Sequence, residues 1–137
     1  FALVIGINKY ASSSFPELAG CEEDVQAIVT LLVNKLGVPS ENVSTLTGKE
    51  ATRENIISQL ISLASENHAA KPGAAFFIHY SGHSGKYESA PGLVKTSHHS
   101  MLAPYDFDPD KSESSGIPFS LLSAYLMKLR AAKGNNI

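Results

Sequence analysis

The chain has 137 residues, of which 43% are hydrophobic and 18% charged, and its formal net charge is −2 at pH 7. This size fits one globular domain with a modest core. The slightly negative charge argues against a nucleic-acid or anionic-membrane partner, because binding such a partner requires a basic face on the protein. The apolar runs are too short to cross a bilayer, no export signal is visible, and the single cysteine forms no internal disulfide. These features predict a cytoplasmic protein.

The first predicted element is a buried strand over residues 2–8, followed by a polar loop that contains three serines. A helix is expected from Glu22 to a stop at Gly37, because apolar residues recur at intervals of three and four and acidic residues occupy the first turn. The predicted inner face of this helix consists of Val25, Ile28, Val29, Leu32 and Leu36.

A second strand is predicted over residues 43–47, and Thr52 is placed to cap a second helix. The third strand is expected over residues 74–80, directly before the letters SGHSG. The irregular stretch 84–116 is too long for a plain connector, so it is expected to contain a hairpin or a functional loop. The predicted inner stripe of the second helix consists of Ile56, Ile57, Leu60, Ile61 and Ala64.

A third helix is predicted from Pro118 to a stop at Gly134, and a fourth strand is expected to begin near Asn136. The order of strands and helices predicts an α/β fold with a parallel sheet and helices on both faces. Chemistry in such sheets gathers beyond the carboxyl ends of the strands, where Cys21 and His83 lie. The expected inner face of the third helix consists of Phe119, Leu122, Tyr125, Leu126 and Leu129.

Two sequence patterns resemble ligand sites without meeting their requirements. The letters LTGKEAT look like the end of a phosphate-binding loop, but the glycine that this motif needs is replaced by Val43. His98 and His99 are adjacent, so their side chains point apart and are poorly placed to share a metal ion. Neither pattern predicts a bound nucleotide or a metal ion.

Three aspartates between residues 106 and 110 have the spacing of a calcium loop. Lys111 replaces the glycine of the sharp turn and Ile117 replaces the bidentate glutamate of such loops. A solvated acidic turn is therefore the favoured interpretation.

Cys21 and His83 are candidates for the nucleophile and base of cysteine chemistry. The start of a helix favours a thiolate, but the three carboxylates that follow Cys21 disfavour it by repulsion. Cys21 is therefore expected to be a packed or pocket-lining thiol. Gly82 and Gly85 allow the backbone near His83 to approach a ligand, with N–H groups that can face an oxyanion, and a histidine there can carry a proton near neutral pH.

Five segments carry a more specific signal: FALVIGINKY, LAGCEEDVQAI, LTGKEATRENI, FFIHYSGHSG and APYDFDP. In this order they resemble the caspase-like peptidases of the metacaspase branch, above all the caspase-domain proteins of fungi. The resemblance covers nearly the whole chain. It implies a caspase–haemoglobinase-like three-layer α/β sandwich with a mostly parallel sheet, here truncated, and a cysteine endopeptidase activity without a cofactor.

The resemblance implies a Cys–His dyad in which His83 is the histidine and the cysteine follows the next strand, beyond Ile137. Residues 1–137 would then be the large-subunit (p20-like) portion of the catalytic domain, incomplete at the C-terminus and inactive alone. Its expected partners are a peptide or protein substrate and the remaining small-subunit portion of the same domain. A caspase-like pseudoenzyme or regulatory interaction domain is the main alternative. A flavodoxin-like module is weaker, because no phosphate loop follows the first strand.

The resemblance also assigns a substrate pocket to Cys21, Asp24 and Ser81. A carboxylate at its base would hold Arg or Lys by a charge-assisted hydrogen bond, so cleavage after these residues is expected. Glu23 replaces the asparagine of the family pattern and adds a second acid, while the alternative for Asp24 is plain charge at a helix N-terminus. The glycine after the family's histidine is Ser84 here, whose backbone N–H is expected to face the oxyanion.

Many metacaspases carry a run of acids after the histidine motif that binds activating calcium. In this chain residues 86–102 contain one acid, Glu88. No calcium site is therefore expected from this segment, and no metal ion is predicted for the chain.

Overall fold

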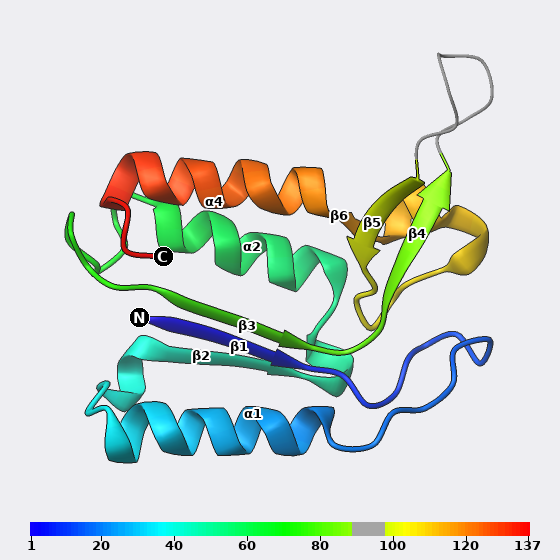
Figure 1. Ribbon diagram of the computed structural model, residues 1–137, viewed down its shortest axis with the longest axis horizontal. Coiled ribbons are helices and arrows are strands. Elements are labelled where there is room, and N and C mark those ends of the chain that lie inside the picture. Colours follow the sequence, from blue (N-terminus) through cyan, green and yellow to red (C-terminus); the bar gives the residue numbers. More distant parts are fainter. Residues whose placement is uncertain (89–97) are drawn as a thin grey trace.

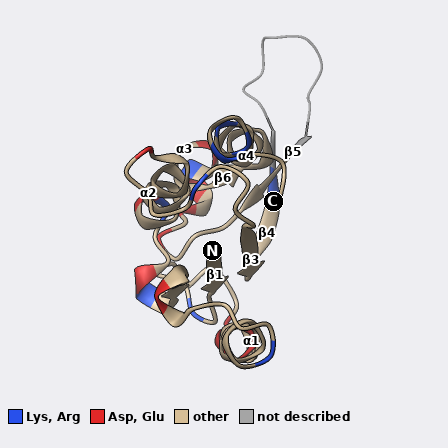
Figure 2. Ribbon diagram, turned by 90° about the vertical axis from the view of Figure 1, so that its left-hand side faces the viewer, with Lys and Arg blue, Asp and Glu red and all other residues tan. Residues whose placement is uncertain are grey.

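The computed structural model describes residues 1–88 and 98–137. A three-stranded parallel sheet has the order β2-β1-β3, with β1 in the centre. Helix α1 covers one face of this sheet, and α2 and α4 cover the other, which gives three layers (Figures 1 and 2). The bounds are β1 Ala2–Gly6, β2 Val43–Thr47, β3 Phe77–Ser81, α1 Cys21–Thr30, α2 Arg53–Ala64 and α4 Phe119–Lys133.

A small antiparallel sheet of order β4-β5-β6 follows the carboxyl end of β3 (Figure 1). It confirms the hairpin expected within residues 84–116. Its strands are β4 Ser84–Glu88, β5 His98–Leu102 and β6 Ile117–Pro118, and the short helix α3 Ser112–Ser115 precedes β6. The remaining turns are the π-helix η1 Leu31–Lys35 and the 3₁₀ helices η2 Ser40–Asn42, η3 Gly48–Glu50 and η4 Pro109–Lys111.

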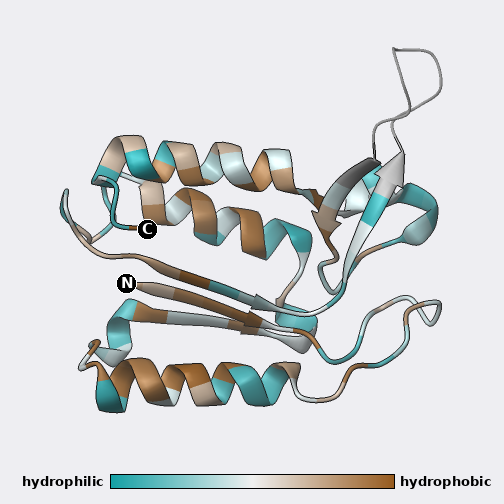
Figure 3. Cartoon of the chain, viewed as in Figure 1, coloured by the Kyte–Doolittle hydropathy of each residue, from teal (hydrophilic) through white to brown (hydrophobic). Residues whose placement is uncertain are grey.

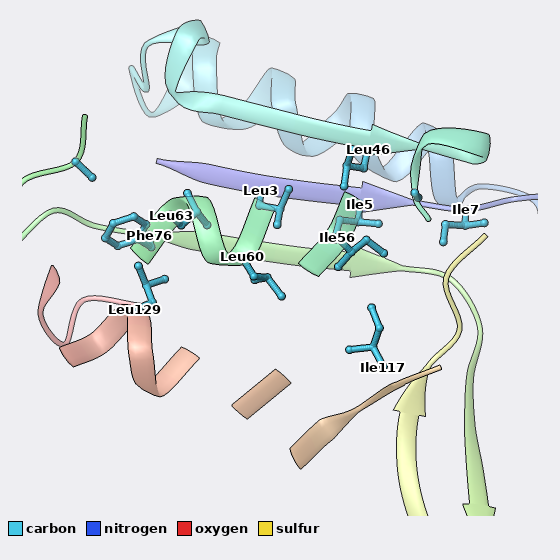
Figure 4. Close-up of a cluster of buried hydrophobic side chains, with 12 residues drawn as sticks. Leu3, Ile5, Ile7, Leu46, Ile56, Leu60, Leu63, Phe76, Ile117 and Leu129 are labelled. Atoms are coloured by element: carbon cyan, nitrogen blue, oxygen red, sulfur yellow. The ribbon is translucent and has the colours of Figure 1, made fainter. Parts of the chain in front are cut away.

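The main hydrophobic core lies between the sheet and the helices α2 and α4 (Figure 4). Alternate residues of β1 face opposite layers: Leu3 and Ile5 enter this core, whereas Val4 packs toward α1 with Val25. Hydrophobic colours accordingly run along β1 and recur along α1 and α2 in Figure 3. A strand buried on both faces explains why residues 2–6 form one continuous apolar run.

Three residues predicted to lie on inner helix faces are exposed instead: Leu36, Ile61 and Phe119. Phe119 is 45% exposed as the first residue of α4. Leu36 is 65% exposed because α1 passes into the π-helix η1, where the Leu36 N–H donates to the Leu31 carbonyl, and the wider turn shifts the phase of the helix. Ile61 is 52% exposed because it borders the buried stripe of α2, which runs through Ile56, Leu60 and Leu63.

The fourth strand predicted near Asn136 is not formed within the described residues. Gly134 ends α4 with a φ of 109°, and the Asn136 carbonyl accepts the Phe76 N–H at 2.8 Å. Residues 134–137 therefore lie beside the segment that leads into β3. The bounds of β3 also differ from the prediction of 74–80, because the strand begins at Phe77 and extends to Ser81.

Gly6 allows α1 to approach the sheet closely. A Cβ at Gly6 would clash with the Cys21 carbonyl and would lie 2.6 Å from Cγ2 of Val25. We expect Gly6→Ala to lower the free energy of unfolding by about 1–3 kcal/mol through overpacking, measured by urea denaturation. Gly85→Ala is the matched control, because its Cβ would meet Met101 at an ordinary 3.6 Å. Equal stability of the two variants would contradict this account of the α1 contact.

Candidate active site

His83 lies two residues after β3, at the carboxyl edge of the parallel sheet. Its Nε2 atom is 2.9 Å from the carbonyl oxygen of Pro16, in the loop that follows β1. Because a carbonyl oxygen only accepts hydrogen bonds, Nε2 must be the protonated nitrogen of this contact. In the neutral imidazole the lone pair is then on Nδ1, which is the ring atom able to take up a proton.

Aromatic rings surround the imidazole of His83. The ring centroids of Tyr10 and Phe15 each lie 5.1 Å from that of His83, and Phe15 meets it edge-on. Phe15 also packs edge-on against Phe107 at 5.2 Å. These contacts restrict the plane of the imidazole and the access of water to its faces. Sequence reasoning did not identify Pro16, Tyr10 or Phe15, and the one available signal was two aromatic residues in the loop NKYASSSFP.

The backbone of His83 is bonded to two phenol hydroxyls. The His83 N–H donates to the Tyr10 hydroxyl at 2.6 Å, and the Tyr80 hydroxyl reaches the His83 carbonyl at 2.9 Å and the Ala103 carbonyl at 2.6 Å. A Cβ at Gly82 would lie 2.7 Å from the Tyr80 oxygen and 2.9 Å from the Tyr10 oxygen. A side chain at position 82 would therefore force the two hydroxyls away from their present positions.

Both phenols remain protonated over the neutral pH range. Burial raises the pKa of Tyr80 far above its ordinary value, and the neighbouring Tyr10 raises it further. Burial likewise raises the pKa of Tyr10. The two hydroxyls can therefore serve as fixed hydrogen-bonding groups next to His83.

Cys21 is the first residue of α1 and is buried. The side-chain oxygen of Asn8 accepts the Cys21 N–H at 2.9 Å and the Glu22 N–H at 3.4 Å, so Asn8 satisfies the first turn of the helix. No hydrogen bond joins Cys21 to His83 within the described part of the chain. Cys21 is therefore buried at the start of α1 and is not bonded to the imidazole.

Asp24 and Ser81 meet directly. The Ser81 hydroxyl donates to Oδ2 of Asp24 at 2.8 Å, because the pairing of Ser81 with Gly6 directs the serine toward α1. Glu23 accepts a longer bond of 3.4 Å from the amide of Asn8. Two of the three residues assigned to a substrate pocket are thus in contact, one turn along α1 from the third.

Ser84 is exposed and is the first residue of β4, where it pairs with Leu102. The Ala103 N–H donates to the His83 carbonyl at 3.0 Å, so residues 83 and 103 occupy a hydrogen-bonded position of the antiparallel ladder. The next pair, Ser84 and Leu102, therefore occupies a non-hydrogen-bonded position, and the Ser84 N–H points away from β5.

Other candidate sites contribute little among residues 1–88 and 98–137. Among the side chains that the structure describes, no three His, Cys, Asp or Glu residues are grouped so that they could hold a metal ion. Asp106 accepts the Arg53 N–H at 2.8 Å at the start of α2, which gives this aspartate a capping role. The side chains of Glu88, His98 and His99 lie outside the described structure. No described helix is both long enough and apolar enough to span a membrane.

Comparison with known proteins identifies the family of this chain. A family profile described as "Metacaspase, peptidase C14 domain" matches residues 1–115. The chain is 37% identical over 113 residues to Metacaspase-1 of Eremothecium gossypii, and 37% identical over 114 residues to Metacaspase-3 of Trypanosoma cruzi. The chain belongs to the metacaspases. It is therefore a member of a caspase-like cysteine peptidase family, as the five sequence segments predicted.

This metacaspase chain matches only part of its relatives. The aligned region covers 78% of the chain and 24% of the Eremothecium protein, and 77% of the chain and 30% of the Trypanosoma protein. A crystal structure of protein GSU0716 from Geobacter sulfurreducens superimposes with a TM-score of 0.70, 22% identity, and coverage of 93% of this chain and 44% of that one. This match and the three observed layers confirm the caspase-like α/β fold.

The raised pKa of Tyr80 predicts a loss of stability in alkali. An unfolded tyrosine has its ordinary pKa of 10.0, whereas burial keeps folded Tyr80 protonated to higher pH. The stabilisation is therefore fully present below pH 10 and is lost as the pH rises above that value. We expect Tyr80→Phe to lower stability at neutral pH but to show a shallower alkaline decline, measured by urea denaturation. If the free energy of unfolding fell equally steeply with pH above pH 10 in Tyr80→Phe and in the wild type, this would contradict the claim that burial keeps the Tyr80 phenol protonated.

Proposed function

We propose that the chain supplies the histidine of a Cys–His dyad in a cysteine endopeptidase, with His83 as general base and then general acid. The observation that carries this proposal is the contact between His83 Nε2 and the Pro16 carbonyl, which reserves Nδ1 for proton transfer. Nδ1 removes the thiol proton, the thiolate attacks the peptide carbonyl, and the imidazolium returns the proton to the leaving amine. Water then hydrolyses the acyl-enzyme with the same histidine as base.

The Pro16 carbonyl has a second role in this proposal. Its oxygen accepts the Nε2 proton in both the neutral and the protonated imidazole, so the ring keeps its orientation while Nδ1 gains and loses a proton. The negative end of the carbonyl dipole also favours the imidazolium that forms during the reaction. The outward N–H of Ser84 is the proposed donor to the developing oxyanion.

The proposed partners within the domain are the segment that would carry the nucleophilic cysteine and the remaining small-subunit portion. Strand β3 is at the edge of the sheet order β2-β1-β3. On its α1-facing side Phe77 is 42% exposed, and the buried Nε2 of His79 has no hydrogen-bond partner in the described structure. A further parallel strand beside β3 would bring a cysteine to the same carboxyl edge as His83.

The proposed substrates are proteins or peptides cleaved after Arg or Lys. The Ser81 hydroxyl holds Asp24 at the edge of the site, and Glu23 adds a second carboxylate on the same turn of α1. A guanidinium or ammonium group would meet these acids in a charge-assisted hydrogen bond.

A pseudoenzyme or regulatory interaction domain is the second candidate. One observation favours it: Ser84 stands where the resemblance places the family's glycine. The residue at the nucleophile position of the complete natural protein decides between the two candidates.

The proposed role of His83 as general base predicts that replacing this residue lowers catalysis. In the complete natural protein, His83→Ala should lower kcat for peptide hydrolysis by about 10²–10⁴-fold, because general acid–base catalysis contributes this much. His68→Ala is the matched control, since His68 contacts Phe1 at the opposite end of the sheet. An active His83→Ala protein would overturn the proposed function, and an inactive wild type would favour the pseudoenzyme.

The proposed pocket predicts substrate preference. Of two peptides that differ only in Arg or Asp before the cleaved bond, the Arg peptide should be hydrolysed faster. Asp24→Asn should lower kcat/KM for the Arg peptide by about ten- to hundredfold, the value of one hydrogen bond to a charged group. Glu54→Gln, in the first turn of α2, controls for the loss of any helix N-terminal acid. Faster cleavage of the Asp peptide would exclude the Arg/Lys assignment.

A further inference from the structure

We propose that Tyr10 and Tyr80 are positioning residues for His83, acting through two phenol hydroxyls that are inserted into the ladder between residues 83 and 103 and bonded to its backbone groups. This inference rests on the proposed function, because it assigns how the catalytic histidine is held. Tyr10 comes from the loop after β1 and Tyr80 from the end of β3. Neither residue acts on a substrate in this proposal.

The insertion is recognised by one missing backbone hydrogen bond of the ladder, from the His83 N–H to the Ala103 carbonyl. In an antiparallel ladder the residues of a hydrogen-bonded pair exchange two bonds, so His83 and Ala103 should each donate to the other. Ala103 does donate to the His83 carbonyl at 3.0 Å. The reciprocal bond is replaced: the His83 N–H goes to the Tyr10 hydroxyl at 2.6 Å, and the Ala103 carbonyl is bonded by the Tyr80 hydroxyl at 2.6 Å.

The two phenols therefore hold both peptide groups of His83. Tyr10 accepts from its N–H, and Tyr80 also reaches its carbonyl at 2.9 Å. Gly82 leaves the space that the two hydroxyls occupy, since a Cβ there would lie within 3.0 Å of both oxygens. In a regular ladder the His83 N–H would point toward β5. The inserted phenols instead direct this N–H toward the loop that carries Pro16.

Tyr10 has an additional contact that Tyr80 lacks. Its ring packs against the imidazole of His83, with 5.1 Å between centroids, while its hydroxyl bonds the backbone of the same residue. Backbone and side chain of His83 are thus fixed by one residue. Because the imidazole is held at Nε2 by Pro16, a shift of the backbone would break that contact or misplace Nδ1. Misplacement of a catalytic group by about 1 Å costs on the order of a hundredfold in rate.

Tyr10→Phe separates the hydroxyl from the ring. The variant keeps the aromatic contact with the imidazole but leaves the His83 N–H without its acceptor. In the complete natural protein we expect kcat to fall about ten- to hundredfold with KM changed less than about twofold. Amide hydrogen exchange at His83 should accelerate at least about tenfold. Tyr80→Phe should lower kcat in the same way. Tyr125→Phe, in α4, is the matched control and should leave kcat and the His83 amide unchanged.

The outcomes separate this proposal from the proposed function. Unchanged kcat and unchanged His83 exchange in a folded Tyr10→Phe protein would overturn it. A lower melting temperature with unchanged kcat would also overturn it, because it would show a merely structural role. If the wild-type protein is inactive, the proposed function fails, and exchange at the His83 amide still decides whether Tyr10 holds this peptide group.

Discussion

The hydrogen bond between His83 Nε2 and the Pro16 carbonyl is the interaction on which the rest of the site depends. It joins the loop after β1 to the turn after β3, two segments that are 67 residues apart in the sequence. It also selects the tautomer of the imidazole, because a carbonyl can only accept. The rings of Tyr10 and Phe15 then restrict the imidazole from its faces, and the carbonyl opposes rotation of the ring.

The parallel sheet brings the loop after β1 and the turn after β3 close together. β1 is buried on both faces, and its pairing with β3 aligns Gly6 with Ser81, so the two following loops leave the sheet side by side. Gly6 lets α1 pack closely, and Asn8 satisfies the first N–H groups of that helix. The same short segment of chain therefore places the acids of α1 beside Ser81 and the Pro16 carbonyl beside His83.

Much of this arrangement could be predicted from the sequence because it follows from local periodicity. The layers, the order of the first three strands, the Thr52 cap of α2 and the position of His83 beyond β3 all agree with the structure, whereas the fourth strand does not form within the described residues. The exposed Leu36 could not be predicted, since the π-helical turn depends on how α1 ends. The roles of Tyr10 and Tyr80 were also hidden, because a buried tyrosine looks like a core aromatic until its hydroxyl is placed against a particular backbone group. The family motifs predicted the membership that the comparisons established, while the pocket and the dyad stay proposals.

The ring nitrogens of His83 provide the most direct test of the account. In the complete natural protein, labelled with ¹⁵N-histidine, their NMR shifts and proton couplings report which nitrogen carries the proton in the neutral ring. The contact with Pro16 predicts the Nε2–H tautomer with an unprotonated Nδ1. A neutral His83 that carries its proton on Nδ1 would contradict the account, because that nitrogen could not then take a proton from a cysteine.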